Sequence, residues 1–318
     1  MLQNWHKNWK IPDEKNSGVK RALFILIILT GLLIPEANSG FYYGINKNRG
    51  MAKSDKMNRE VNAILEAYGD MISKVESKDN DVVFHINNKE IFYCDGKMLA
   101  RNNLHDKKSF KSIIYPYPGL HNNVIDIVEW DKTPRSSDFT EALFGSSSEI
   151  SKHCKWIKFI RHSIYINNAI IDQLSKVEAE ILKSAETKPE IMKFIDDCKA
   201  IFAFMPRNIK GTNSKSFHAF GLALDLIPES YNNKDVVWSW TKVFNKNWHL
   251  VPMEKRWSPP KEVIQAFENH GFIWGGNWLR YDNIHFEYRP EILEFNKNKD
   301  LELIPDFLKF RGVNIKAE

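Results

Sequence analysis

The 318-residue sequence predicts an α+β fold, in which helices and antiparallel strands are interleaved. Segments with apolar residues at helical spacing alternate irregularly with short strand-like runs, and no regular β-α-β pattern is present. The hydrophobic fraction of 43% and the charged fraction of 27% are ordinary for a folded chain. They exclude a wholly disordered, collagen-like or multi-span membrane protein. The net charge of +5 is too small and too dispersed to favour nucleic acid as a partner.

Residues 1–39 carry the pattern of an exported protein. An apolar run over residues 22–34 follows Lys20 and Arg21 and is followed by small residues, which is typical of a secretory signal peptide. The run is shorter than the roughly 20 residues that span a membrane, but the leader before it is long. A cleaved signal peptide, an uncleaved membrane anchor and a merely buried helix therefore stay open. Either of the first two predicts a periplasmic or cell-envelope location, with membrane attachment possible through this segment.

Apolar spacing and turn residues predict the elements that follow. In chain order we expect a tether over 40–58, a helix over 59–77, two hairpin turns at Asn87-Asn88 and Asp95-Gly96 within strands over 81–99, a strand over 124–130, helices over 150–185 and 190–202, a strand over 222–227, a helix or loop region over 230–260, a helix over 260–270 closed by Gly271, and a strand over 283–288. We group residues 40–149 as an N-terminal extension or accessory region and residues 150–318 as the main domain.

The three cysteines are Cys94, Cys154 and Cys198, with no C-x-x-C pair among them. The sequence therefore offers neither a cysteine-type zinc site nor a thioredoxin-like motif. At most one disulfide can form, and we expect three small buried thiols.

The segment that starts at Ser216 reads SFHAFGLALD and holds two side chains of the types that bind zinc, His218 and Asp225. Their spacing of seven residues would place them on opposite faces of a uniform strand. Gly221 between them permits the chain to bend, so we expect His218 on a turn and Asp225 on the strand that follows. A carboxylate in such an apolar strand is costly to bury unless it is paired or bound to a metal.

A second segment reads DNIHFEY from Asp282 to Tyr288. Alternation along the strand places His285 and Glu287 on one face. Two imidazoles and one carboxylate make three protein ligands and leave a fourth position for water, which is typical of a catalytic zinc site. Asp282, three residues before His285, is the candidate general base that takes a proton from that water.

These motifs, S-x-H-x-x-G-x-A-x-D followed by D-x-x-H-F-E, resemble the zinc D-alanyl-D-alanine carboxypeptidase and L-alanyl-D-glutamate endopeptidase family, which acts on peptidoglycan peptides and includes phage endolysins. The strings RNIKGTNSKSFH at 207–218 and HGFIWGGNW at 270–278 also resemble one bacterial branch. The resemblance is strong over about 200–290. It implies a small D,D-peptidase or hedgehog-like α+β fold with one zinc ion in a cleft.

The resemblance also implies roles for individual residues. His218, Asp225 and His285 would bind zinc, Asp282 would be the general base, and Arg207 and Ser216 would contact substrate or developing negative charge. The Tyr-Arg-Ser stretch of many relatives is missing upstream, and we expect Arg207 to substitute for it. For Glu287, contact with a zinc-binding histidine and a salt bridge at a strand end both stay open.

The sequence therefore predicts an exported zinc metallopeptidase, a hydrolase that cleaves cell-wall stem peptides by Asp-assisted attack of zinc-bound water. Both the D-Ala-D-Ala carboxypeptidase and the L-Ala-D-Glu endopeptidase reactions stay open, as does the oligomeric state. The alternative is a metal-holding, non-catalytic cell-wall binding module of the same fold. Asp282 favours the enzyme, because a structural site needs no unliganded acid. We expect peptidoglycan peptides, and no nucleic acid, as partners.

Overall fold

The computed structural model describes residues 53–78, 81–117, 133–209, 212–278 and 280–297. The predicted export segment, the strand expected over 124–130 and most of the tether lie outside these residues. No helix within the described ranges is both long and apolar enough to cross a membrane. Cys94, Cys154 and Cys198 are buried and free.

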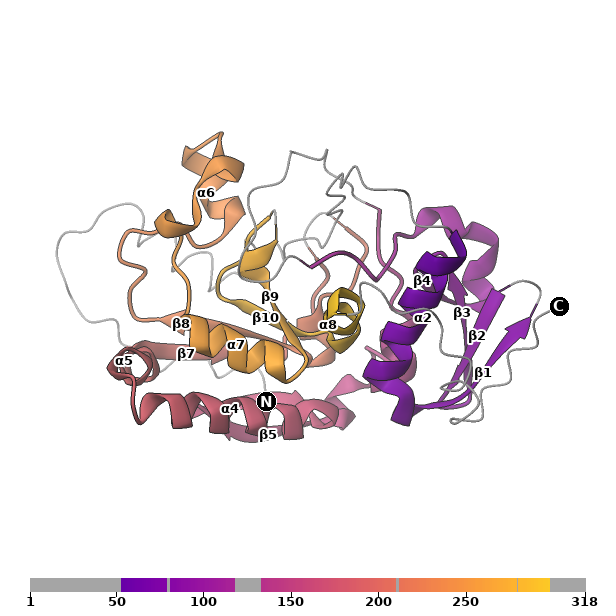
Figure 1. Ribbon diagram of the computed structural model, residues 1–318, viewed down its shortest axis with the longest axis horizontal. Helices are drawn as coiled ribbons and strands as arrows, with labels where there is room; N and C mark the ends of the chain where they lie inside the picture. Colours follow the sequence, from indigo (N-terminus) through magenta and orange to yellow (C-terminus); the bar gives the residue numbers. More distant parts are fainter. Residues whose placement is uncertain (1–52, 79–80, 118–132, 210–211, 279, 298–318) are drawn as a thin grey trace. The chain divides into compact units, whose positions relative to one another are not determined.

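Residues 53–117 form one helix and a four-stranded antiparallel sheet whose strands follow chain order (Figure 1). The elements are α2 (Lys53–Tyr68), β1 (Ile72–Lys78), β2 (Asp81–Ile86), β3 (Lys89–Cys94) and β4 (Lys97–Ala100). Asn87 and Asn88 both have positive φ, as a two-residue hairpin turn requires, and Asp95 and Gly96 form the next turn in the same way. Both predicted turns are confirmed.

The helix expected over 59–77 is wrong in its second half. The helix ends at Tyr68, and Ile72 and Val75, which fit a helical stripe, lie instead on β1. Val75 pairs with Phe84 of β2 and is fully buried there. Cross-strand pairing, which short-range spacing does not report, decides the conformation of this segment.

The helix expected over 150–185 begins only at Ile171. Its first part is a hairpin of β5 (Cys154–Phe159) and β6 (His162–Asn167), with Ile160 and Arg161 at positive φ in the turn. Trp156, which a helix would have buried, is 58% exposed on β5. Two helices follow, α4 (Ile171–Ala185) and α5 (Pro189–Asp197), and the expected continuation of the second helix to 202 is strand β7 (Cys198–Phe202).

The sheet that holds the candidate site is antiparallel throughout and has the strand order β7-β8-β10-β9. Its other strands are β8 (Ala223–Pro228), β9 (Phe272–Trp274) and β10 (His285–Tyr288). Helix α7 (Lys261–Asn269) covers it, with the ring of Phe267 stacked on Phe286 of β10 at a centroid distance of 4.0 Å. The predicted strands over 222–227 and 283–288 and the helix over 260–270 are thus present. Mixed helices and antiparallel sheets agree with the predicted α+β class.

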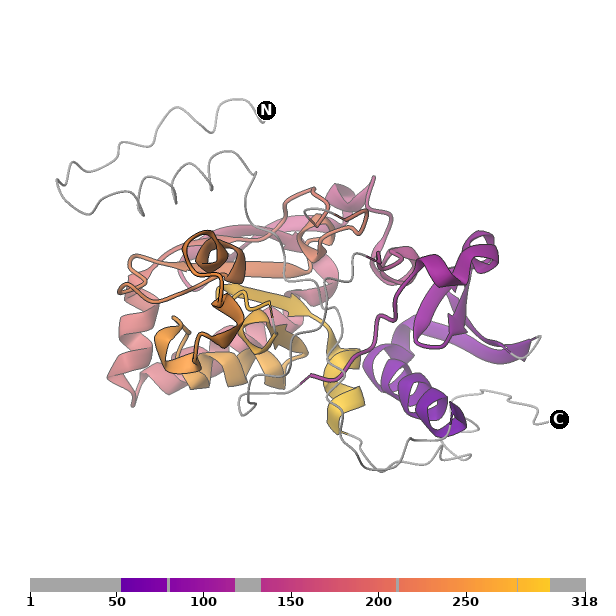
Figure 2. The same cartoon turned by 90° about the horizontal axis from the view of Figure 1, so that it is seen from above.

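Helix α2 packs against α8 (Pro290–Lys297) at the end of the sheet, as both ribbon views show (Figure 2). The guanidinium of Arg59 donates hydrogen bonds to the carbonyl oxygen of Phe295 and lies 4.2 Å from the centre of its ring. A continuous buried core includes side chains from residues 61–114 and from 139–295. Residues 53–117 are therefore packed onto the sheet region and not merely tethered to it.

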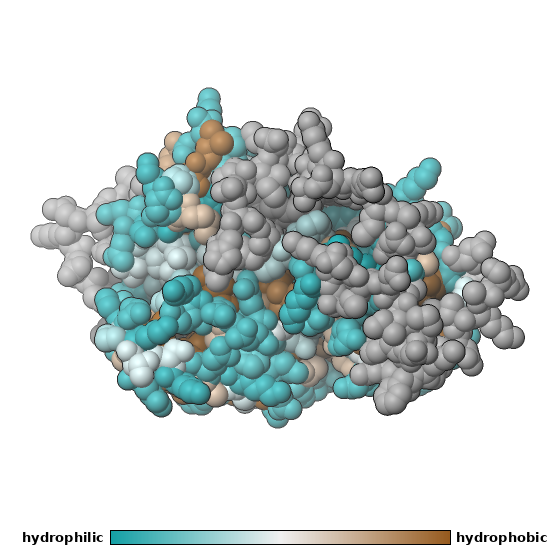
Figure 3. Space-filling view, in the orientation of Figure 1, coloured by the Kyte–Doolittle hydropathy of each residue, from teal (hydrophilic) through white to brown (hydrophobic). Residues whose placement is uncertain are grey.

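The remaining elements are short. They are α3 (Asp138–Phe144), α6 (Trp238–Phe244) and the 3-10 segments Gly69–Met71, Arg101–Ser109, Ile150–His153, Asn168–Ile170, Phe217–Phe220, Trp248–Leu250, Met253–Lys255 and Gly275–Asn277. Most of the visible face is polar, and apolar atoms gather over α6, where Val243 and Phe244 are 72% and 60% exposed (Figure 3).

Candidate metal centre

The turn that carries His218 is built as the sequence predicts. Ser216 is the N-cap of the 3-10 segment Phe217–Phe220, and its Oγ accepts a hydrogen bond from the His218 backbone N–H at 3.1 Å. Gly221 ends the segment at φ 62°, and a Cβ there would lie 2.9 Å from the backbone nitrogen of Asn167. Glycine is therefore required at this position, and the bend leads directly into the strand that carries Asp225.

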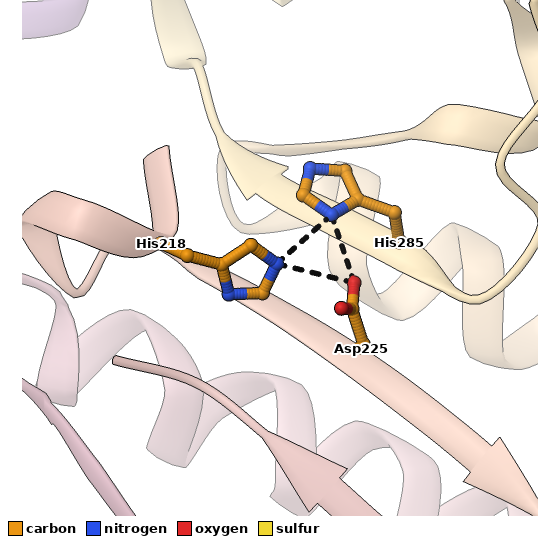
Figure 4. Close-up of side chains that lie close together, drawn as sticks. All are labelled: His218, Asp225 and His285. Carbon is orange, nitrogen blue, oxygen red and sulfur yellow. Dashed lines mark hydrogen bonds and ion pairs between the residues drawn. The ribbon is translucent and has the colours of Figure 1, made fainter. Parts of the chain in front are cut away.

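Two strands and this turn bring three side chains together (Figure 4). Asp225 of β8 is the register partner of His285 on β10. The His285 Nδ1 lies 2.9 Å from Asp225 Oδ1, the His218 Nε2 lies 3.2 Å from the same oxygen, and the two nitrogens are 3.3 Å apart. All three residues are at most 1% exposed.

The outer hydrogen bonds of the two imidazoles fix where their protons lie. The His218 Nδ1 is 2.5 Å from the carbonyl oxygen of Ala203, which only accepts, so we place the proton on Nδ1. The His285 Nε2 faces Glu287 Oε2 at 3.3 Å, so by the same reasoning it carries the proton. In the neutral rings the remaining nitrogens then present lone pairs toward Asp225. Histidines that bind metals are oriented by outer partners of this kind.

Three lone-pair donors that converge without a proton between them repel one another unless a cation lies among them. Tetrahedral zinc with bonds of about 2.0–2.1 Å to nitrogen and oxygen separates its ligand atoms by roughly 3.3 Å, close to the observed 2.9–3.3 Å. The second carboxylate oxygen of Asp225 is buried and has no hydrogen-bond partner among the described residues. The donor set fits one zinc ion.

Glu287 makes both contacts that the sequence left open, one with a predicted zinc-binding histidine and one with an arginine at the end of its strand. One carboxylate oxygen contacts His285, and the other accepts a hydrogen bond from Arg289 at 3.2 Å. Burial raises the pKa of Glu287, but His285, Arg135 and Arg289 together lower it well below 4.5. An ionised carboxylate is thus held against the outer nitrogen of His285.

Asp282 lies where β10 begins and is fully buried. Its backbone N–H donates to the carbonyl oxygen of Gly275 at 3.0 Å, and its own carbonyl oxygen accepts from the His285 N–H at 3.2 Å. Burial first, and then the charges of Asp282 and Asp225, raise the pKa of the Tyr231 phenol. The hydrogen bond between the Asp282 carbonyl oxygen and the His285 N–H places Asp282 beside one member of the triad.

The structure places Arg207 and Ser216 side by side through their backbones. The Ser216 N–H donates to the Arg207 carbonyl oxygen at 3.1 Å. Asn208 and Lys215 form an isolated antiparallel β-bridge beside it. The Ser216 hydroxyl is buried in its capping role, and the Arg207 side chain is half-buried. Contact of either side chain with substrate stays a prediction.

Two neighbours of the site, Trp278 and Tyr231, were not among the predicted site residues. The ring of Trp278 lies 5.4 Å from that of His285, and its indole N–H has no partner within the described ranges. Tyr231 lies in a segment without a recognisable motif, so no local signal points to it. Trp278 closes the HGFIWGGNW string, whose position directly before Asp282 is the signal that could have found it.

The fold and the site point to one class of protein, in which two imidazoles and one carboxylate can hold a single metal ion and an acid lies nearby. Residues 210–288 match the family model for D-alanyl-D-alanine carboxypeptidase, and this match supports a zinc D-Ala-D-Ala carboxypeptidase-like family for the segment. The match confirms the resemblance inferred from the motifs, and the family supports a metallopeptidase that acts on peptidoglycan and is typically zinc-dependent. No solved structure gave a significant match to the chain.

Proposed function

We propose that the protein is an exported zinc peptidase that hydrolyses amide bonds in the stem peptides of peptidoglycan. The observation that carries the proposal is the convergence of three proton-free donor atoms inside a segment matched to this peptidase family. The secretory pattern of residues 1–39 supports action in the periplasm or cell envelope. Peptidoglycan peptides are then the partner of the site.

His218, Asp225 and His285 would hold the zinc. When bound, zinc supplies a Lewis acid for the peptide carbonyl and lowers the pKa of water at its open position. Asp282 would accept the proton of the attacking water and pass it to the amine that leaves as the C–N bond breaks. Arg207 would offset the negative charge that develops on the carbonyl oxygen.

The D,D-peptidase or hedgehog-like fold and its zinc cleft are part of this proposal. An antiparallel sheet of four strands with α7 packed on it supports the fold. Residues 40–149, which the sequence predicts to be an extension or accessory region, contribute α2 and the sheet of β1 to β4. The carboxypeptidase and endopeptidase reactions remain two outcomes for the same centre.

Burial of the ligands supports a second candidate, a metal-holding module without catalysis. His218, Asp225 and His285 are almost inaccessible to solvent, as ligands of a closed structural zinc site are. The buried acid Asp282, whose backbone is hydrogen-bonded to His285, favours the enzyme over this candidate.

The experiment that separates the two candidates uses the full chain and defined muropeptides. We expect loss of the terminal D-alanine, or cleavage between L-Ala and D-Glu, in product masses, abolished by a chelator and restored by zinc. Asp282→Asn should keep zinc and lose turnover. A protein that binds zinc but yields no product from any muropeptide would support the binding module instead.

A further inference from the structure

A chain of buried ionic contacts runs from the metal centre to helix α2. Glu287, which contacts His285, accepts a hydrogen bond from Arg289 Nη1 at 3.2 Å. The Arg289 Nε donates to Glu291 Oε1 at 2.5 Å. The other oxygen of Glu291 accepts from the hydroxyl of Tyr68 at 2.6 Å, across 223 positions of sequence. Tyr68 is the last residue of α2, so the chain ends in the N-terminal region.

Two further groups hold the middle of this chain. The Arg289 Nη2 donates to the carbonyl oxygen of Ile113. Arg135 lies 3.9 Å from Glu287 Oε1, and its backbone N–H donates to Ser214 Oγ at 2.7 Å. Ile113 therefore holds the guanidinium of Arg289, and Arg135 holds the carboxylate of Glu287.

The charges of this network balance. Two carboxylates, Glu287 and Glu291, face two guanidinium groups, Arg135 and Arg289, and all four residues are at most 8% exposed. Burial opposes the charge on Arg289, but Glu291, Tyr115 and Glu287 raise its pKa above the usual value. Removal of one partner from such a set leaves an uncompensated buried charge, which the remaining groups accommodate only by moving. Each member therefore restrains the position of the next.

We propose that helix α2 is a positioning part of the metal centre, and that Tyr68, through Glu291 and Arg289, sets zinc affinity by fixing the Glu287 carboxylate against His285. The inference rests on the proposed function only in taking zinc as the ion. Glu287 holds the proton of His285 on Nε2 and so directs Nδ1 toward Asp225. On this account residues 53–117 are needed for the site itself, beyond any role in wall binding.

Helix α2 itself offers a matched control for a test of the positioning role of Tyr68. Tyr68 and Arg59 both lie on α2, and both donate hydrogen bonds to groups on α8. Tyr68 donates to the ionic chain, whereas Arg59 donates to the Phe295 carbonyl oxygen outside it. Tyr68→Phe and Arg59→Gln therefore each remove a tie between the same two helices, and only the first should reach the metal.

The measurement is the dissociation constant of zinc for the full chain, by competition with a chromophoric chelator, with the Tm of each metal-free variant beside it. Tyr68→Phe should weaken zinc binding by about 10-fold and Glu287→Gln by about 10- to 100-fold, the range for outer partners of metal ligands. Arg59→Gln should bind like the wild type, even if its Tm falls as far as that of Tyr68→Phe. The visible spectrum of bound Co²⁺ should change in Tyr68→Phe and not in Arg59→Gln.

Equal zinc affinity in Tyr68→Phe and the wild type, or equal weakening in both α2 variants, would overturn the positioning role. Failure of the wild type itself to bind zinc would instead contradict the proposed function. Arg289→Lys keeps the charge but cannot contact Glu287, Glu291 and Ile113 together. It should weaken zinc binding at least as much as Tyr68→Phe, which provides a second test if Glu287→Gln does not fold.

Discussion

Two regions of the molecule bring together histidine and carboxylate ligands within reach of one ion, and they differ in what surrounds those ligands. His218, Asp225 and His285 are buried between β8, β10 and the preceding turn. Glu76, His85 and Glu90 lie half-buried on the sheet of residues 72–100. Residue types and spacing alone do not distinguish the two groups.

The difference lies in the counter-charges. On the N-terminal sheet, Lys74 pairs with Glu76, His85 Nε2 lies 2.9 Å from Glu76, and Arg101 pairs with Glu90 at 2.5 Å. Protein cations already satisfy those carboxylates. At the buried group, the described cations Arg135 and Arg289 contact Glu287 and leave the inward donors to an ion. The position of protons and charges, more than the ligand types, predicts which group binds metal.

The largest expected effect is the loss of the metal from the buried group. His285→Ala should abolish tight zinc binding and the rise in Tm that zinc produces in the wild type, because ligand binding stabilises the folded state. His85→Ala should leave both unchanged. Zinc titration followed by calorimetry checks this, and a zinc affinity that drops in His85→Ala would reverse the ranking of the two groups.

Removal of the general base comes next. Asp282→Asn should lower kcat on a muropeptide by about 10²–10⁴-fold, the range for loss of positioned acid–base catalysis, with zinc affinity retained. Steady-state kinetics at saturating zinc measure it. Normal turnover in this variant would assign the proton transfer to another group.

The third prediction concerns the Tyr231 hydroxyl, whose pKa responds to both Asp225 and Asp282. Burial and the nearby charges of Asp282 and Asp225 raise its pKa, so its hydroxyl stays protonated and able to donate at neutral pH. Tyr231→Phe should lower kcat/KM by about 10-fold, the size of one lost hydrogen bond, without a change in zinc affinity. An unchanged kcat/KM would restrict Tyr231 to packing against Trp257.

The smallest effect concerns acid stability, and it separates the half-buried carboxylate of Glu76 from the fully buried one of Glu287. Hydrogen bonds from Lys74 and His85 lower the pKa of Glu76 from 4.5 to about 2, and the pKa of Glu287 is lowered in the same direction. A folded pKa below the unfolded one means that stability is present above about pH 4.5 and is lost as pH falls toward 2. High salt should weaken the Glu76 contribution and leave that of Glu287.

Urea unfolding of Glu76→Gln and Glu287→Gln, above and within this pH range and at two salt concentrations, measures the two contributions. Glu76→Gln should change the pH dependence of the free energy of unfolding less in high salt than in low salt. The change that Glu287→Gln causes should be the same at both salt concentrations. Equal salt sensitivity would mean that the Glu287 network is open to solvent.

The sequence was sufficient where structure depends on local chemistry. The Asn87-Asn88 turn, the bend at Gly221 and the shared face of His285 and Glu287 all follow from residues close in the chain. It was insufficient for residues 150–170, because the pairing of β5 with β6 overrides a helical spacing of apolar residues. The tie between Tyr68 and Glu291 joins positions 223 apart. The one local feature that hints at these buried ionic contacts is the alternation of acidic and basic residues in HFEYRPE, from His285 to Glu291.

The most direct test of the account is a zinc titration of the chelator-treated full chain, with cleavage of a defined muropeptide followed in the same samples. We predict that one equivalent of zinc binds and that cleavage rises in proportion to it, while His285→Ala neither binds nor cleaves. Cleavage that persists without zinc, or zinc bound at one equivalent without any cleavage, would contradict the assignment of a catalytic zinc centre to His218, Asp225 and His285.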